Sequence, residues 1–181
     1  MNKTIITIFL VTVLVGCSNQ SKKEELNNET NILKNTSLEY IDEWNQIELA
    51  HTDDKYGEWG GDSDIILIYS DGKNLYANYS KYLGSRKPPA PPDLNKKPKK
   101  WYEYKKLDFK IDSIIIDKNK TDLVENAILE LVKQKVYNST SFSHSGIKNS
   151  VITRDSSLII NDFPSNKWLT FQKLKNFLIK K

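Results

Sequence analysis

The side chains that could do metal or nucleophilic chemistry are few and scattered. His51 is followed by Asp53 and Asp54, and His144 lies between two serines. A metal shell would have to join both histidines with an aspartate, and no HEXXH-like spacing supports one. Serines beside a histidine in sequence do not make a catalytic pair, because neighbouring side chains usually point apart. We therefore expect no metal site, and we expect both histidines to lie in exposed loops.

A second group of candidate chemical residues consists of acids around a pair of glycines. Glu58, Asp62 and Asp64 flank Gly60-Gly61 and could offer carboxylates to a hard cation or to acid–base catalysis. The spacing lacks the alternating ligands of an EF-hand loop, and the chain has no G-x-S-x-G motif. A hydrolase remains an alternative, but the sequence identifies no catalytic residue and no cofactor.

The strongest candidate for a binding site is a cationic segment with aromatic residues directly behind it. The segment 88–92, Pro-Pro-Ala-Pro-Pro, cannot be a central strand or a helix, and lysines flank it. Ammonium groups backed by aromatic rings suit an anionic polymer or a protein partner, whereas a solvated crossover loop is the simpler interpretation. Including an aromatic residue of the glycine-rich loop, the candidate binding residues are Trp59, Lys87, Lys96, Lys97, Lys99, Lys100, Trp101 and Tyr102.

The composition argues against a nucleic-acid partner. The formal net charge is +4, from 27 basic and 23 acidic residues, which is a small bias. Only two of the basic residues, Arg86 and Arg154, are arginines, so the guanidinium fork that usually recognises phosphates and bases is scarce.

The amino terminus has the proportions of an export signal. Lys3 precedes an apolar stretch over 5–15, which is too short to span about 30 Å of hydrocarbon. The stretch ends in Leu14-Val15-Gly16-Cys17, which resembles the lipobox of bacterial lipoproteins. The resemblance implies that a peptidase cuts before Cys17 and that the thiol carries diacylglycerol, with palmitate-like chains that hold the protein to a membrane.

The resemblance also implies a location in the cell envelope. Ser18 rather than aspartate follows Cys17, which is similar to lipoproteins that are not retained in the inner membrane. Lys22-Lys23-Glu24-Glu25 is similar to a tag of some surface-displayed lipoproteins. We expect an outer-membrane location on the periplasmic or surface face, and no disulfide, because Cys17 is the only cysteine.

The domain organisation follows from composition. Residues 1–16 form the predicted signal peptide, and the polar stretch 17–36 is typical of a flexible tether. Residues 37–181 are predicted to form one globular domain with a proline- and lysine-rich loop at 84–100. Its first element is expected to be a short helix over 38–49, with Ser37 as the cap.

The remaining elements alternate between strands and helices. Asp71-Gly72 predicts a hairpin between strands at 65–69 and 75–79, and residues 151–153 and 158–160 predict another. Residues 101–116 read as a strand region with a break near Lys105-Lys106. Apolar periodicity predicts a helix after Thr121, with Thr121 as its cap. A last helix after Ser165 should turn five residues inward: Trp168, Phe171, Leu174, Phe177 and Leu178. These elements indicate an α+β fold, a mostly antiparallel sheet of about five strands with two or three helices.

The expected function is a lipid-anchored interaction module without catalysis. The segment 57–62, Gly-Glu-Trp-Gly-Gly-Asp, before a strand and hairpin resembles small uncharacterised bacterial proteins, some suspected to be toxin-immunity factors. The alternatives are a toxin-immunity inhibitor, an envelope hydrolase with an unrecognised site, and a purely structural lipoprotein.

Overall fold

The computed structural model describes residues 38, 40–87, 99–137 and 142–180. Its contacts divide the chain into Met1–Glu39 and Tyr40–Lys181, and every element below belongs to the second unit. The predicted lipidation site Cys17, the predicted signal and tether, and Lys96 and Lys97 lie outside the described residues.

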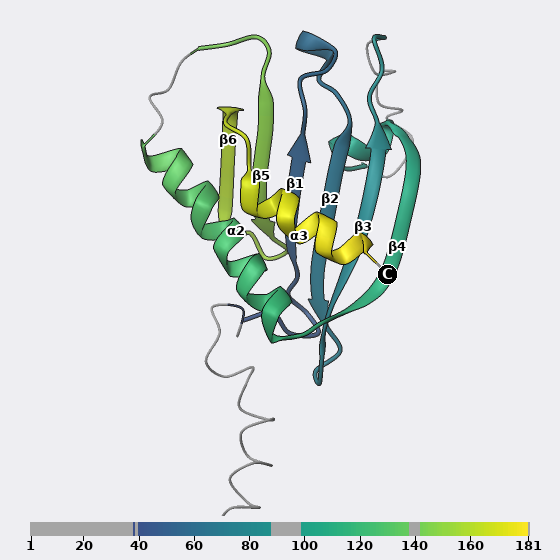
Figure 1. Cartoon of the computed structure of the whole chain (residues 1–181), viewed down its shortest axis with the longest axis vertical. Coiled ribbons are helices and arrows are strands. Elements are labelled where there is room, and N and C mark those ends of the chain that lie inside the picture. Colours follow the sequence, from purple (N-terminus) through teal and green to yellow (C-terminus); the bar gives the residue numbers. More distant parts are fainter. Residues whose placement is uncertain (1–37, 39, 88–98, 138–141, 181) are drawn as a thin grey trace, which may run out of the picture. The chain divides into compact units, whose positions relative to one another are not determined.

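The second unit is built on one antiparallel sheet. Its six strands are β1 (Ile47–Thr52), β2 (Ser63–Ser70), β3 (Leu75–Leu83), β4 (Lys106–Ile116), β5 (Ile147–Thr153) and β6 (Ile159–Ser165). They lie in the order β4-β3-β2-β1-β5-β6 (Figure 1). The helices α2 (Lys118–Tyr137) and α3 (Leu169–Ile179) accompany them, with short 3-10 turns η2 (Gly57–Trp59) and η3 (Trp101–Tyr104). The predicted α+β class and both predicted hairpins are confirmed.

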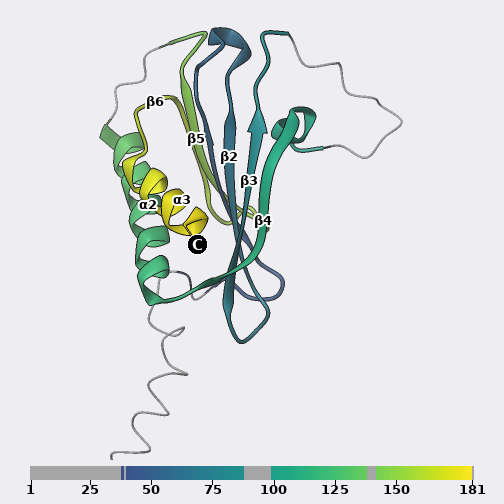
Figure 2. The same cartoon turned by 45° about the vertical axis from the view of Figure 1, so that its right-hand side comes forward.

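The two helices lie on one side of the sheet (Figures 1 and 2). The core forms on that side because alternate strand residues are apolar there. In β1, Leu49 pairs with Ile66 on one side and with Val151 on the other, and all three are fully buried. Trp168, at the start of α3, stacks on Phe171 with ring centroids 4.6 Å apart. Burying each such side chain contributes about 1.5–3 kcal/mol.

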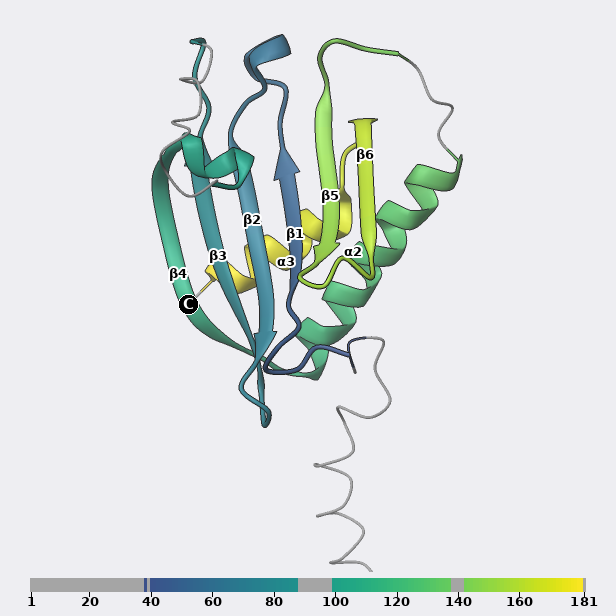
Figure 3. The ribbon, with the colours of Figure 1, turned by 180° about the vertical axis from the view of Figure 1, so that it is seen from behind.

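The opposite face of the sheet carries no long helix among the described residues (Figure 3). We call it the open face. It presents the other half of each strand's alternation, which in β1 is Glu48, Ala50 and Thr52. The turn η3 covers its middle, where Tyr102 is buried against Ala50 and Ile65.

The helix termini are fixed by side chains. Asp117 caps α2, because its Oδ1 accepts the Lys120 N–H at 3.0 Å. The prediction that Thr121 is the cap is wrong; its hydroxyl donates to the Asp117 carbonyl one turn later. The first amides of α3 have no cap of their own and donate to Glu130 of α2, from Leu169 at 2.9 Å and Thr170 at 2.7 Å.

Three further predictions about local structure are wrong. No helix occurs over 40–49, because Asp42 Oδ1 accepts the N–H groups of the two residues that follow at i+2 and i+3, which makes a turn. The chain then enters β1, where pairing on both sides outweighs the helix-like spacing. Trp101–Tyr104 is a 3-10 turn and not a strand, although the break at Lys105 is correct. Phe177 is 45% exposed, whereas the other four predicted residues of the last helix are buried.

Within the described ranges, none of the helices is both long enough and apolar enough to cross a membrane.

Candidate functional site

A hollow lies on the open face, where β1 and β3 end and β5 begins. We call it the first pocket; its volume is about 700 Å³. Its walls are aromatic and cationic: Trp59, Trp101, Tyr104, Phe163, Lys87, Lys105, Lys106, Lys148 and His144, with Glu58 as the single acid among the described residues. Backbone and small side chains of the surrounding loops complete the lining. The walls therefore suit a ligand with negative charge and flat apolar surface.

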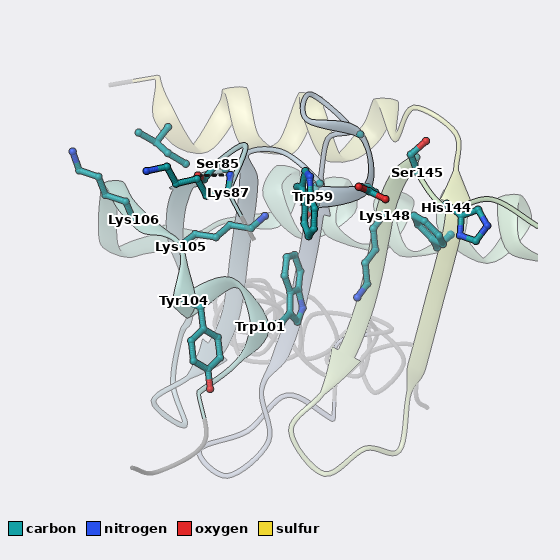
Figure 4. Close-up of a pocket in the computed structure, with 18 residues that line it drawn as sticks. Trp59, Ser85, Lys87, Trp101, Tyr104, Lys105, Lys106, His144, Ser145 and Lys148 are labelled. Atoms are coloured by element: carbon teal, nitrogen blue, oxygen red, sulfur yellow. Dashed lines mark hydrogen bonds between the residues drawn. The ribbon is translucent and has the colours of Figure 1, made fainter. Parts of the chain in front are cut away.

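Trp101 is the centre of this arrangement. The Lys105 Nζ lies 5.0 Å from its ring centroid and the Lys148 Nζ 4.8 Å from it. In Figure 4 the two lysines approach Trp101 from left and right, and Trp59 lies above it in this view. Both ammonium groups are within the range in which an indole face attracts a cation.

The two lysines differ in what else they contact. Lys105 Nζ donates to the Gly61 carbonyl at 2.7 Å and to the Ser63 hydroxyl at 2.8 Å. Burial lowers the pKa of Lys105, and the Lys148 charge lowers it further, while Asp53 and Asp62 act in the opposite direction. Lys148 forms no ion pair with any carboxylate in the part of the chain that the structure describes.

The loop that carries Trp59 is held at its base by close backbone packing. Asp53 Oδ1 accepts the Asp62 N–H at 3.0 Å, and Asp62 Oδ1 accepts the Gly84 N–H at 2.9 Å. A Cβ on Gly84 would collide with the backbone of Gly61, and one on Gly61 with Asp53. These glycines let the end of β3 pass close to the loop, so Trp59 has a defined place above the pocket.

A second pocket of about 430 Å³ lies on the open face beyond η3. Its lining includes Gln46, Glu48, Leu67, Lys100, Trp101, Tyr102, Ile152, Thr153, Arg154 and Ser156. Glu48 is 8% exposed and accepts the Tyr102 hydroxyl at 2.6 Å and the Lys100 ammonium. Burial and this hydrogen bond raise the pKa of Tyr102, so its hydroxyl stays a donor. The interactions seat η3 on the sheet and thereby position Trp101.

The structure separates the predicted binding residues into groups. Trp59, Lys87 and Trp101 line the first pocket. Lys100 and Tyr102 are engaged with Glu48 in the second pocket, and Trp101 lines both. Lys99 is exposed and lines neither of the two pockets.

The other residues with candidate chemistry do not form one site. His51 is buried in β1, contrary to the expected loop position, because its Nδ1 hydrogen-bonds Asn149 Oδ1 at 2.7 Å beneath α3. His144 is exposed and lines the first pocket. Asp64 turns to the helix side, where it binds Tyr79 and Lys175. Among the described residues, no group of three or more His, Cys, Asp or Glu side chains is placed to hold a metal ion.

Comparisons of the chain with family models, with curated proteins and with solved structures find no match. Its function must therefore be inferred from the chemistry of the pocket. The sequence did not single out Lys105 or Lys148, the two cations at Trp101. For Lys148 a signal was present, because alternation with the buried Asn149 places it on the solvent side of a strand.

Proposed function

We propose that this protein is a lipid-anchored, non-catalytic binding module of the cell envelope, and that its first pocket accepts an anionic ligand. One observation carries the proposal: Lys105 and Lys148 both contact the ring of Trp101, and Lys148 has no carboxylate partner within the described ranges. A pocket in which one of two neighbouring ammonium groups lacks a carboxylate partner has an affinity for anions.

The energetics favour an anion between the two lysines. Each ammonium gains about 0.5–2 kcal/mol from the indole face, but the two like charges repel each other. A carboxylate, sulfate or phosphate between them removes that repulsion and forms charge-assisted hydrogen bonds with both. The exposed rings of Trp59, Trp101 and Tyr104 would then contact the apolar face of the group that carries the anion.

The anchoring part of the proposal rests on Leu14-Val15-Gly16-Cys17. Two or three acyl chains on one residue bind a membrane far more durably than one, at about 0.8 kcal/mol per buried methylene. Cells fed with radiolabelled palmitate should incorporate the label into the wild-type chain and not into a Cys17→Ser variant. A product of unmodified mass that begins at Met1 would rule the anchor out.

The binding part is tested with the full chain purified in detergent. The probes are polygalacturonate, poly(glycerol phosphate) and uncharged dextran, measured by isothermal titration calorimetry. We expect an anionic probe to bind, dextran not to bind, and affinity to fall as salt rises. Lys148→Gln should weaken binding about fivefold, the effect of roughly 1 kcal/mol.

Lys133→Gln provides the matched control, because Lys133 is an exposed lysine on α2. It should bind the probes like the wild type. If no anionic probe binds, or if Lys148→Gln and Lys133→Gln bind equally well, the pocket is not an anion site and the proposal fails.

A further inference from the structure

The two pockets lie on the same face of the sheet, on either side of η3. Along β1, Thr52 lines the first pocket and Glu48 the second. Along β5, Lys148 lines the first and Ile152 the second. Four residues along a strand correspond to about 13 Å. The two pockets are therefore close enough for one short oligomeric ligand to reach both.

Trp101 is the residue that both pockets share. Tyr102, its neighbour, is buried on Ala50 and Ile65, and the two rings meet edge to face at 5.5 Å. Trp101 itself remains 38% exposed. A ligand that passes from one pocket to the other must cross this indole, whose position is fixed from below.

Each pocket offers positive charge of its own. In the second pocket the Glu48 carboxylate is already satisfied by Lys100 and Tyr102. The remaining charge there is Arg154, which is exposed and whose Nη1 donates a long 3.4 Å bond to the Trp44 carbonyl. The first pocket supplies Lys148 and Lys105. The open face thus has cations in both pockets and the Trp101 ring between them. This arrangement suits a polymeric ligand that carries a negative charge on each repeating unit.

We infer that the ligand is an acidic polysaccharide chain that occupies both pockets and crosses Trp101. This inference rests on the proposed function and narrows it to a polymer. A sugar ring presents C–H groups to an indole face while its carboxylate, sulfate or phosphate substituent reaches the cations. Single-stranded nucleic acid would also stack on aromatic residues, but a chain with two arginines has little of the usual phosphate-recognition chemistry.

The experiment measures affinity as a function of ligand length. The full chain in detergent is titrated with galacturonate and with a graded series of oligogalacturonates, in parallel with a phosphodiester-linked glycan series and with oligo(dT). Affinity should rise with length until the oligomer exceeds the separation of the pockets, and then level off. The series that binds more tightly identifies carboxylate or phosphate as the anionic group.

Two variants separate the pockets. Lys148→Gln should weaken both short and long oligomers, whereas Arg154→Gln should weaken only the long ones, about fivefold, with Arg154→Lys restoring most of the affinity. Circular dichroism melting confirms that each variant is folded. If Lys148→Gln weakens binding while Arg154→Gln does not, and affinity does not depend on ligand length, the ligand does not occupy both pockets. That result would overturn this inference but would still support the anion site in the first pocket. Tighter binding of oligo(dT) than of either glycan series would also overturn it.

Discussion

Replacing Lys100 by glutamine should destabilise the fold more than replacing its partner Glu48 by glutamine. The Glu48 side chain is 10% exposed and Lys100 is 55% exposed, so only one member of the pair depends on the other for solvation. In Lys100→Gln the carboxylate stays buried and keeps only the Tyr102 hydroxyl as a strong partner. In Glu48→Gln the amide oxygen still accepts from Tyr102, and the ammonium turns to water.

The magnitudes follow from this asymmetry. Breaking a fully buried ion pair costs about 3–5 kcal/mol, and the exposure of Lys100 reduces this to about 2 kcal/mol. Glu48→Gln loses a screened charge interaction and should cost about 0.5–1 kcal/mol. The double variant has no charge left in this buried pair. Its stability should lie within about 0.5 kcal/mol of that of Glu48→Gln, and it should be more stable than Lys100→Gln.

Urea unfolding followed by circular dichroism measures these differences, because about 2 kcal/mol moves the midpoint by about 1 M. Lys135→Gln provides a comparison, because it removes a longer ion pair, in which Lys135 Nζ lies 3.9 Å from Asp162 Oδ1. If Glu48→Gln costs as much as Lys100→Gln, or if the double variant shows the sum of the two losses, Glu48 is not a buried charge that needs Lys100.

Further perturbations test the supports of the site and of the helices. Gly84→Ala should cost about 1–3 kcal/mol and weaken ligand binding in calorimetry, because its Cβ meets the Gly61 backbone, whereas Lys133→Gln, on the exposed surface of α2, should do neither. Glu130→Ala should cost about 1–2 kcal/mol in urea unfolding without changing ligand affinity, because it leaves two amides of α3 uncapped. Burial raises the pKa of Tyr79, so the folded state keeps a proton that the unfolded state loses above about pH 10. Stability should therefore fall as pH rises past that value, and Tyr79→Phe should show a shallower fall in melting temperature, while an equal slope would contradict the assignment.

Local signals were sufficient for much of the fold. Asp71-Gly72 predicts the β2–β3 hairpin because a tight turn needs positive φ, and Gly72 has φ of 84°. The apolar period of α2 identifies Val124, Ala127 and Leu131, which are all buried. These elements are decided by residues close together in sequence, and for that reason the sequence is informative about them.

The misassigned stretch shows where such signals fail. Residues 38–49 place apolar side chains near helical spacing, yet Leu49 pairs with β2 and β5 at the centre of the sheet. No local pattern reveals that this segment pairs with β2, about twenty residues later, and with β5, about one hundred residues later. The two cations described at Trp101 are a similar case, because Lys148 lies almost fifty residues away in sequence and neither it nor Lys105 was among the predicted binding residues.

The distribution of charge in the folded unit explains why one pocket stands out. Asp64 is satisfied by Lys175 and Tyr79, Glu48 by Lys100 and Tyr102, and Glu130 by the start of α3. Each of these acids has a structural partner, so none of them is left to act on a ligand. At Trp101 the balance is reversed: two ammonium groups share one indole, and Glu58 is the only acid that the described part of the chain places in the pocket wall. Under the proposed function, an anion supplied from outside would offset the repulsion between these two ammonium groups, which no described carboxylate does for Lys148.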